Sequence, residues 1–124
     1  MEHLALMEKV LDQRLPTALT NKSLQRHKKE TKMETANNPM EHSFLNMDNG
    51  TLLWPEKAES KNSIDMVENT HTLSQNLNHP STIQLLDLLT KLLQFDPNLR
   101  LTANEALNHP FFNNMREYMI EELV

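Results

Sequence analysis

The sequence has a single glycine, Gly50, and no cysteine among its 124 residues. Average usage of about 7% would give roughly nine glycines. Gly-x-Gly-x-x-Gly and Walker-type loops need several glycines so that the backbone can approach a phosphate closely, and the sequence therefore excludes both kinds of nucleotide loop. The lack of cysteine excludes disulfides, thiol catalysis and cysteine-ligated zinc sites, and it gives no information about redox compartment.

Long apolar runs are also absent. No segment approaches the roughly 18 uninterrupted apolar residues of a membrane span, and the N-terminus has neither the basic start nor the apolar stretch of a signal peptide. We therefore expect an intracellular chain that is not secreted, and we expect neither a membrane nor a nucleic acid as a direct partner. The six histidines show no spacing of three or four residues, so the sequence predicts no zinc site.

Apolar residues make up 38% of the sequence and are unevenly distributed along it. Near the N-terminus, four of them recur at helical spacing and predict an amphipathic helix over residues 2–12 that ends before Pro16. These four are Leu4, Met7, Val10 and Leu11.

From residue 13 to residue 78 this periodicity is lost and polar residues dominate. Such a composition buries too little apolar surface to offset the entropy lost on ordering. We therefore interpret residues 16–79 mostly as a long polar loop or disordered insert. Residues 51–54 are the candidate for a short extended piece within it, and no other segment predicts a strand.

Charge is segregated within this insert. Residues 21–32 carry five basic residues and one acidic residue, for a local charge of +4, although the whole chain has a net charge of −5. Residues 41–80 instead hold six acidic residues against two lysines. A basic run of this kind is usually a solvated loop, and the functional alternative is docking of an acidic or phosphorylated partner.

The last part of the chain, residues 80–124, has clear helix signals. Ser81 or Thr82 can cap the start of a helix with a broad apolar face, and Pro97 predicts that this helix ends near Phe95–Asp96, because proline disfavours helical conformation in the preceding residue. The apolar face consists of Ile83, Leu85, Leu86, Leu88, Leu89, Leu92 and Leu93.

Two further helices are expected after Pro97. Thr102 and Glu105 have the spacing of a capping box, which predicts a short helix from Thr102 to about Leu107 that stops at His109-Pro110. A final amphipathic helix is expected over residues 115–123, with an apolar face made by Met115, Tyr118, Met119 and Leu123.

Residues 85–112, LLDLLTKLLQFDPNLRLTANEALNHPFF, resemble the last conserved block of the eukaryotic protein kinase domain. In that block a leucine-rich helix is followed by Asp-Pro-x-x-Arg-x-Thr/Ser-x-x-x-Ala-Leu-x-His-Pro-Phe-Phe. The residues that match it in order and spacing are Asp96, Pro97, Arg100, Thr102, Glu105, Ala106, Leu107, His109, Pro110, Phe111 and Phe112.

The sequence of the predicted N-terminal helix narrows this resemblance to one group of protein kinases. EHLALMEKVL over residues 2–11 is similar to the Glu-His-Leu-Ala-Met-Met-Glu-Arg-Ile/Val-Leu signature of the LAMMER, or cdc-like, kinases. Trp54 similarly resembles the Leu-x-Trp segment that these kinases carry between the two blocks. Asp12-Gln13 departs from the Gly-Pro that usually follows the signature. The signature residues matched here are Glu2, His3, Leu4, Ala5, Met7 and Glu8.

The resemblance implies a mainly α fold, a partial helical C-terminal lobe of the protein kinase-like fold. It divides the chain into a signature helix at residues 1–15, the polar insert at 16–79 and a final helical block at 80–124. No Val-Ala-Ile-Lys, His-Arg-Asp, Asp-Phe-Gly or Ala-Pro-Glu motif is present. We therefore assign no catalytic, cofactor-binding or metal-binding residue, and ATP and Mg belong to the parent kinase alone.

Two residues of the final block invite functional interpretations. The resemblance pairs Arg100 with the glutamate of Ala-Pro-Glu outside this chain, and losing one partner of a buried pair costs about 3–5 kcal/mol. We therefore expect the isolated chain to fold poorly or to leave Arg100 exposed, and a plain surface charge is the alternative. His109 could act as a base or ligand, but the family's use of His-Pro-Phe-Phe as a packing corner favours a structural role.

Two functional hypotheses follow. In the first, the chain is the C-terminal part of a LAMMER-type dual-specificity serine/threonine kinase, inactive without the N-terminal part that carries the catalytic motifs. The resemblance then implies ATP-dependent phosphorylation of Arg/Ser-rich splicing factors by the parent, and a location in the nucleus or cytoplasm. In the second, the chain is a non-catalytic helical interaction or regulatory module derived from a kinase.

Overall fold

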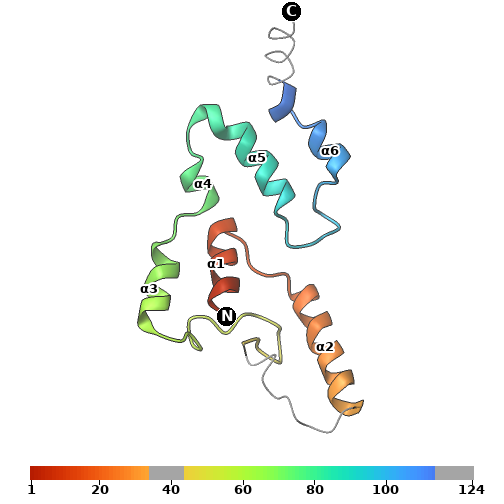
Figure 1. The fold of residues 1–124 in the computed structure, drawn as a ribbon. Helices are drawn as coiled ribbons and strands as arrows, with labels where there is room; N and C mark the ends of the chain where they lie inside the picture. The colour runs from red at the N-terminus through yellow and green to blue at the C-terminus, as the bar shows by residue number, and fades with distance from the viewer. Residues whose placement is uncertain (34–43, 114–124) are drawn as a thin grey trace, which may run out of the picture. The chain divides into compact units, whose positions relative to one another are not determined.

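The computed structural model describes residues 1–33 and 44–113, except for the side chains of residues 27, 28 and 30–33. Figure 1 shows helices joined by loops over these ranges, which contain no β-strand beyond an isolated antiparallel bridge between Leu45 and Leu52. The chain forms two compact units, one over Met1–His71 and one that begins at Thr72. No helix in the described residues is long and apolar enough to cross a membrane.

The first unit contains three helices. The predicted N-terminal helix is present as α1, Glu2–Leu11, followed by α2, Thr17–Met33, and α3, Lys61–Asn69 (Figure 1). Ser60 caps α3, because its hydroxyl accepts the backbone N–H of Ser63 at 3.1 Å. α1 ends at Asp12, which has the left-handed conformation with φ 50°.

A small apolar core holds the first unit together. Its buried members come from α1, α2, α3 and the loop between α2 and α3, and partly buried Phe44 and Trp54 pack against them. The buried members are Ala5, Leu24, Leu45, Leu52 and Val67.

The prediction that residues 16–79 are mostly a polar loop is therefore wrong for α2, α3 and the short helix α4, Leu73–Asn76. Apolar residues in this segment come singly or in runs of two or three such as Leu52-Leu53-Trp54, so no local window looks able to bury much surface. They nevertheless meet at one place, where Leu24, Leu45 and Val67 share a cluster with α1. Burial is collective here, and tertiary packing supplies the stability that local composition lacks.

A tight turn brings Leu45 and Leu52 together within this core. Asn46 N–H donates to the carbonyl of Thr51 and Gly50 N–H donates to the carbonyl of Asn46, both at 2.8 Å. Gly50 has φ +72°, a conformation that side chains disfavour. A Cβ at Gly50 would also lie 2.6 Å from side-chain oxygens of Thr20 and Asn21 on α2. The only glycine of the chain is thus where the turn touches α2.

The second unit begins with α4, whose first turn is closed by a capping box between Thr72 and Gln75. A 3₁₀ turn, Pro80–Thr82, then leads into α5, Ile83–Leu92, and α6, Ala103–Leu107, follows after a loop. Leu88 of α5 is buried. The helix expected over residues 115–123 lies outside the described residues.

Both ends of α5 differ in detail from the prediction. Thr82 is the N-cap residue, but its hydroxyl donates to the carbonyl of His79 at 2.8 Å instead of accepting a helix N–H. The helix ends at Leu92, before the predicted boundary near Phe95–Asp96. Pro97 sets only the latest possible end. Beyond the end of α5, Arg100 donates two hydrogen bonds to the carbonyl of Gln94.

We predict that Gly50→Ala destabilises the chain by more than about 1 kcal/mol, because alanine disfavours positive φ and its Cβ would collide with α2. Urea denaturation followed by circular dichroism measures the effect. Asp12→Gly is the matched control, since it places glycine at the exposed left-handed position of the same unit and should leave stability unchanged or higher. Equal stability of Gly50→Ala and the parent chain would contradict the strain at this turn.

Candidate functional site

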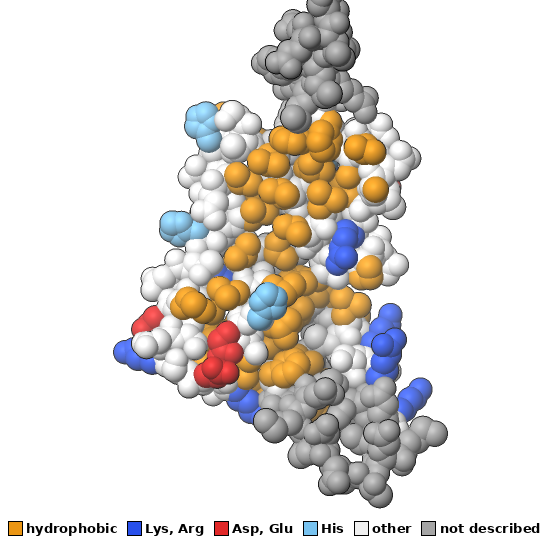
Figure 2. Space-filling view, in the orientation of Figure 1, with side chains coloured by type: hydrophobic (Ala, Val, Ile, Leu, Met, Phe, Trp, Pro, Cys, Tyr) orange, Lys and Arg blue, Asp and Glu red, His pale blue; other side chains and the backbone are white. Residues whose placement is uncertain are grey.

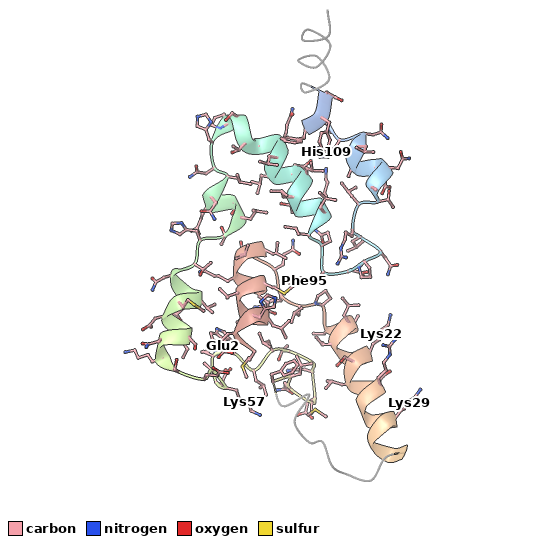
Figure 3. All side chains as sticks on the ribbon, in the orientation of Figure 1. Glu2, Lys22, Lys29, Lys57, Phe95 and His109 are labelled. Carbon is pink, nitrogen blue, oxygen red and sulfur yellow. The ribbon has the colours of Figure 1, made fainter. Side chains whose placement is uncertain are left out.

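The matched family residues fall into two groups, one on α1 in the first unit and one between Asp96 and Phe111 in the second. Figure 3 labels Glu2 and His109 as one member of each group. Among the α1 residues, Ala5 and Glu8 are buried, Leu4 and Met7 are half-buried, and His3 is exposed.

Glu8 fastens the segment after α1 back onto the helix. Its carboxylate accepts the backbone N–H of Leu15 at 2.7 Å and Nη1 of Arg14 at 3.1 Å. Both carboxylate oxygens therefore have partners, as a buried charge requires. The role of this signature glutamate in the first unit is to fix the path of the chain from α1 toward α2.

The departure from Gly-Pro at residues 12 and 13 has a local explanation. Asp12 occupies a left-handed conformation that glycine adopts more readily. Gln13 donates its backbone N–H to the carbonyl of Glu8 at 3.1 Å, a bond that proline could not make. Asp12 thus has the left-handed backbone conformation that is typical of glycine, and Gln13 uses a backbone N–H that proline lacks.

Glu2 links the start of α1 to the segment before α3. Its Oε1 accepts the backbone N–H of Glu59 at 3.0 Å. This bond lowers the pKa of Glu2, because it stabilises the charged carboxylate. A pocket of about 260 Å³ lies along α1 in the same unit, with Glu8, Trp54, Val67 and Glu68 among its lining residues.

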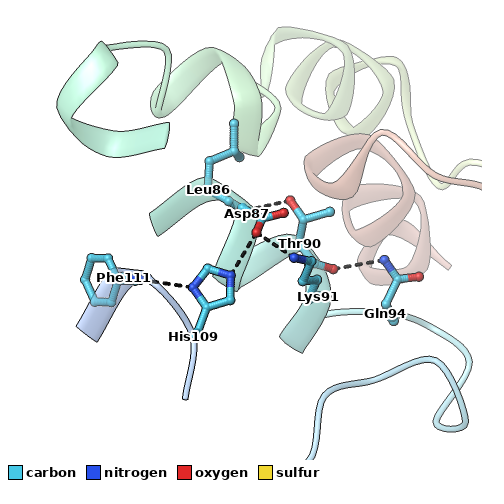
Figure 4. A network of polar contacts seen from close by, with 7 residues as sticks. All are labelled: Leu86, Asp87, Thr90, Lys91, Gln94, His109 and Phe111. Carbon is cyan, nitrogen blue, oxygen red and sulfur yellow. Dashed lines mark hydrogen bonds and ion pairs between the residues drawn. The ribbon is translucent and has the colours of Figure 1, made fainter. Parts of the chain in front are cut away.

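In the second unit His109 is buried and holds the end of the motif against α5 (Figure 4). Phe111 donates its backbone N–H to Nδ1 of His109 at 3.2 Å, so Nδ1 is an acceptor and carries no proton. The proton is then on Nε2, which donates to Oδ2 of Asp87 at 2.8 Å. Both ring nitrogens are therefore engaged in contacts within the unit, which favours a structural role for His109.

Asp87 joins two partners on the surface of α5. The same Oδ2 that accepts from His109 also accepts from Nζ of Lys91 at 2.6 Å. The hydrogen bond from Lys91, and then that from His109, lowers the pKa of Asp87. Thr90 and Gln94 continue the contacts along the helix, since the hydroxyl of Thr90 donates to Leu86 and Nε2 of Gln94 donates to the carbonyl of Thr90.

Arg100 is exposed, which is one of the two outcomes expected for this chain. Its Nε and Nη2 donate to the backbone carbonyl of Gln94 at 3.1 and 2.9 Å. These bonds fix the guanidinium between the end of α5 and the loop before α6. Its pairing with a glutamate outside the chain stays a prediction.

The remaining matched residues shape the loops around α6. The predicted capping box is confirmed, since Glu105 N–H donates to the hydroxyl of Thr102 at 3.3 Å and Thr102 N–H donates to the Glu105 carboxylate at 2.8 Å. The Thr102 hydroxyl also donates to the Glu105 carboxylate at 2.7 Å, and this bond, followed by the one from the Thr102 N–H, lowers the pKa of Glu105. Asp96 accepts the backbone N–H of Asn98 at 2.9 Å. Pro97, Leu107 and Pro110 are exposed, Ala106 is half-buried, and the half-buried rings of Phe111 and Phe112 meet edge to face at 5.1 Å.

The sequence analysis did not predict which side chains form hydrogen bonds with the motif residues. Asp87 and Lys91 have the i,i+4 spacing of a helical ion pair, which could have indicated their contact. Asp87 and His109 are 22 residues apart, and no pattern joins them. In the described residues no group of three or more histidine, cysteine, aspartate or glutamate side chains is placed to hold a metal ion.

Comparison with known proteins finds kinases that are similar over nearly the whole chain. No family model matches the chain. It is 36% identical over 97% of its length to the serine/threonine-protein kinase AFC1 of Arabidopsis thaliana and 34% identical over 90% to the dual specificity protein kinase lkh1 of Schizosaccharomyces pombe. The crystal structure of the PF14_0431 kinase domain superposes with a TM-score of 0.70 and 31% identity over 91% of the chain.

The chain has the sequence and fold of a part of the C-terminal lobe of a LAMMER-type protein kinase. It spans only part of each relative, 23% of AFC1, 14% of lkh1 and 28% of the PF14_0431 chain. The resemblance to LAMMER-type kinases is therefore confirmed across nearly the whole chain, and the roles of the individual motif residues stay predictions. The segment lacks the catalytic motifs that the resemblance assigns to other parts of a kinase.

We predict that Asp87→Ala destabilises the chain more than Lys91→Ala. The first leaves the Nε2–H of buried His109 without an acceptor, which costs about 1–3 kcal/mol. The second removes a half-exposed surface ion pair, worth about 0.2–1 kcal/mol. Urea denaturation of both variants tests the difference, and equal losses would show that His109 gains nothing from Asp87.

The lowered pKa of Glu105 predicts acid sensitivity of the capping box. A carboxylate with a lowered folded-state pKa stabilises the fold above its ordinary pKa of 4.5 and loses that contribution as the pH falls through the folded value. Glu105→Gln keeps a hydrogen-bonding side chain but cannot titrate, so it should flatten the pH dependence of stability below 4.5. Denaturation series at several acidic pH values check this, and identical profiles for both chains would refute it.

Proposed function

We propose that this chain forms the helical base of the C-terminal lobe in a LAMMER-type dual-specificity kinase. The parent reaction would be ATP-dependent phosphorylation of serine, threonine and tyrosine in proteins. The observation that carries the proposal is agreement over at least 90% of the chain with kinases in sequence and with a kinase domain in fold. Both motif groups occur in the order that the family requires.

The residues of this chain do not fit ATP or Mg. Its only glycine lies in a turn against α2, and none of the kinase motifs that hold phosphates, magnesium or the substrate hydroxyl occurs in the sequence. The chain would therefore contribute scaffold and no chemistry. The partner we propose is the part of a kinase that carries those motifs, with ATP and Mg bound there.

Arg100 is the residue best prepared to meet that partner. A guanidinium has five N–H donors, and the bonds to Gln94 engage only Nε and Nη2. The bonds to one carbonyl also hold the planar group in place before a carboxylate arrives, which reduces the entropy lost on pairing. A glutamate at the end of the activation segment would complete the pair.

The substrates we propose are Arg/Ser-rich splicing factors, and the location is the nucleus or cytoplasm. Both come from the family resemblance.

A second role, as a non-catalytic interaction module, is favoured by one observation. Ile83 and Leu99 in the second unit are 60% and 67% exposed. Figure 2 shows hydrophobic side chains gathered over α5 on the visible face. Apolar surface of this kind is typical of a face that another protein covers, whether catalytic or not.

A chimeric kinase tests the proposed function. The matching segment of AFC1 is replaced by this chain, and phosphorylation of an Arg/Ser-rich peptide is measured beside the chain alone. We expect the chimera to phosphorylate the peptide and the isolated chain to give only background.

Arg100→Ala in the chimera should lower its stability by about 3–5 kcal/mol through loss of a buried pair, whereas the exposed Lys61→Ala should not. A folded chimera without activity would refute the catalytic role and leave the interaction module. An Arg100→Ala chimera as stable as the parent would refute the pairing.

A further inference from the structure

The helix α2 carries a straight stripe of cations that no feature of the kinase resemblance explains. Lys22, Arg26 and Lys29 are all exposed. At 3.6 residues per turn they lie within an arc of about 60°, and they extend about 10 Å along the helix axis. Figure 3 shows Lys22 and Lys29 projecting from the same side of α2.

The opposite side of α2 faces the core, so the stripe is held in a fixed orientation. Leu24 and Thr20 are buried at 3% and 7% exposure. They lie about 160–200° around the helix from Lys22. The three cations therefore face away from the first unit, and no ion pair joins them to another residue in the described part of the chain.

The charge of α2 contrasts with the rest of the molecule. Residues 17–33 have a charge of +4 in a chain whose net charge is −5, which leaves −9 on all other residues. Such segregation favours a short anionic ligand, because the net negative charge of the other residues repels a long polyanion. Nucleic acid is further disfavoured because α2 has no Phe, Tyr or Trp side chain on which a base could stack.

We propose that the Lys22–Arg26–Lys29 stripe docks a protein segment that carries two phosphoserines. Serines at positions i and i+2 of an extended peptide lie on one face about 7 Å apart. Lys22 and Lys29 are separated by about 10 Å along the helix with Arg26 between them, so two phosphates about 7 Å apart can both contact the stripe and share Arg26. Phosphoserine carries a charge of about −1.5 to −2, so two of them neutralise the three cations more fully than two carboxylates do.

Fluorescence anisotropy with the full chain tests this docking. The probe is a labelled peptide with phosphoserines at i and i+2, compared with its unphosphorylated and glutamate-substituted forms. We expect the phosphorylated peptide to bind, with at least about tenfold higher affinity than the glutamate form. Equal binding of the phosphorylated and glutamate forms, or tighter binding of a single-stranded oligonucleotide of equal charge, would overturn the proposal.

Three variants separate the stripe from net charge. Lys29→Glu should raise the Kd at least about fivefold, whereas Lys61→Glu, with the same charge change on exposed α3, should leave it within about twofold. Exchanging Lys22 with its exposed neighbour, as Lys22→Ser with Ser23→Lys, keeps net charge and turns one cation by about 100°.

The exchange should weaken binding, and circular dichroism verifies that each variant keeps its helices. If the exchange leaves the Kd unchanged, or if Lys61→Glu acts like Lys29→Glu, net charge alone attracts the peptide and the stripe is not a docking site. This test does not depend on kinase activity, so its result is separable from that of the chimera.

Discussion

The first unit depends on a convergence of a few apolar residues from separate segments. Leu24, Leu45 and Val67 each have at most one apolar residue directly beside them in the sequence, and each would gain little by folding locally. Together with Ala5 they form one buried cluster. The helices α2 and α3 and the turn at Gly50 all take their positions from it. Everything that the chain offers on its surface in this unit, including the stripe on α2, rests on that cluster.

The parts of the fold that could be predicted from the sequence are those with short-range causes. α1 was visible from its apolar spacing, and the start of α6 was visible from the Thr102–Glu105 capping box. The helices of the insert could not be predicted in this way, because α2 owes its stability to Leu24 meeting residues from three other segments. A pattern limited to one window contains no information about such partners.

In the candidate site, too, sequence patterns revealed what depends on neighbouring residues and not what depends on residues far apart in the chain. The motif residues were identified by order and spacing, and the comparisons with kinases confirm the family. Their physical roles became clear only from the structure. His109 is placed by Asp87, and Glu8 is placed by Arg14 and Leu15. In both groups a carboxylate oxygen accepts hydrogen bonds from another segment of the chain, so these residues stabilise the arrangement of the segments.

The segregation of charge has a consequence for how the molecule behaves near other charged surfaces. The chain is acidic, with a pI of about 5.6. From its net charge alone, one would expect it to bind to an anion exchanger and not to a cation exchanger. The cations of α2 nevertheless form a compact positive region whose field persists over about 10 Å at 0.1 M salt. A negative surface would therefore be attracted to that helix at low salt, although the chain as a whole has a net negative charge.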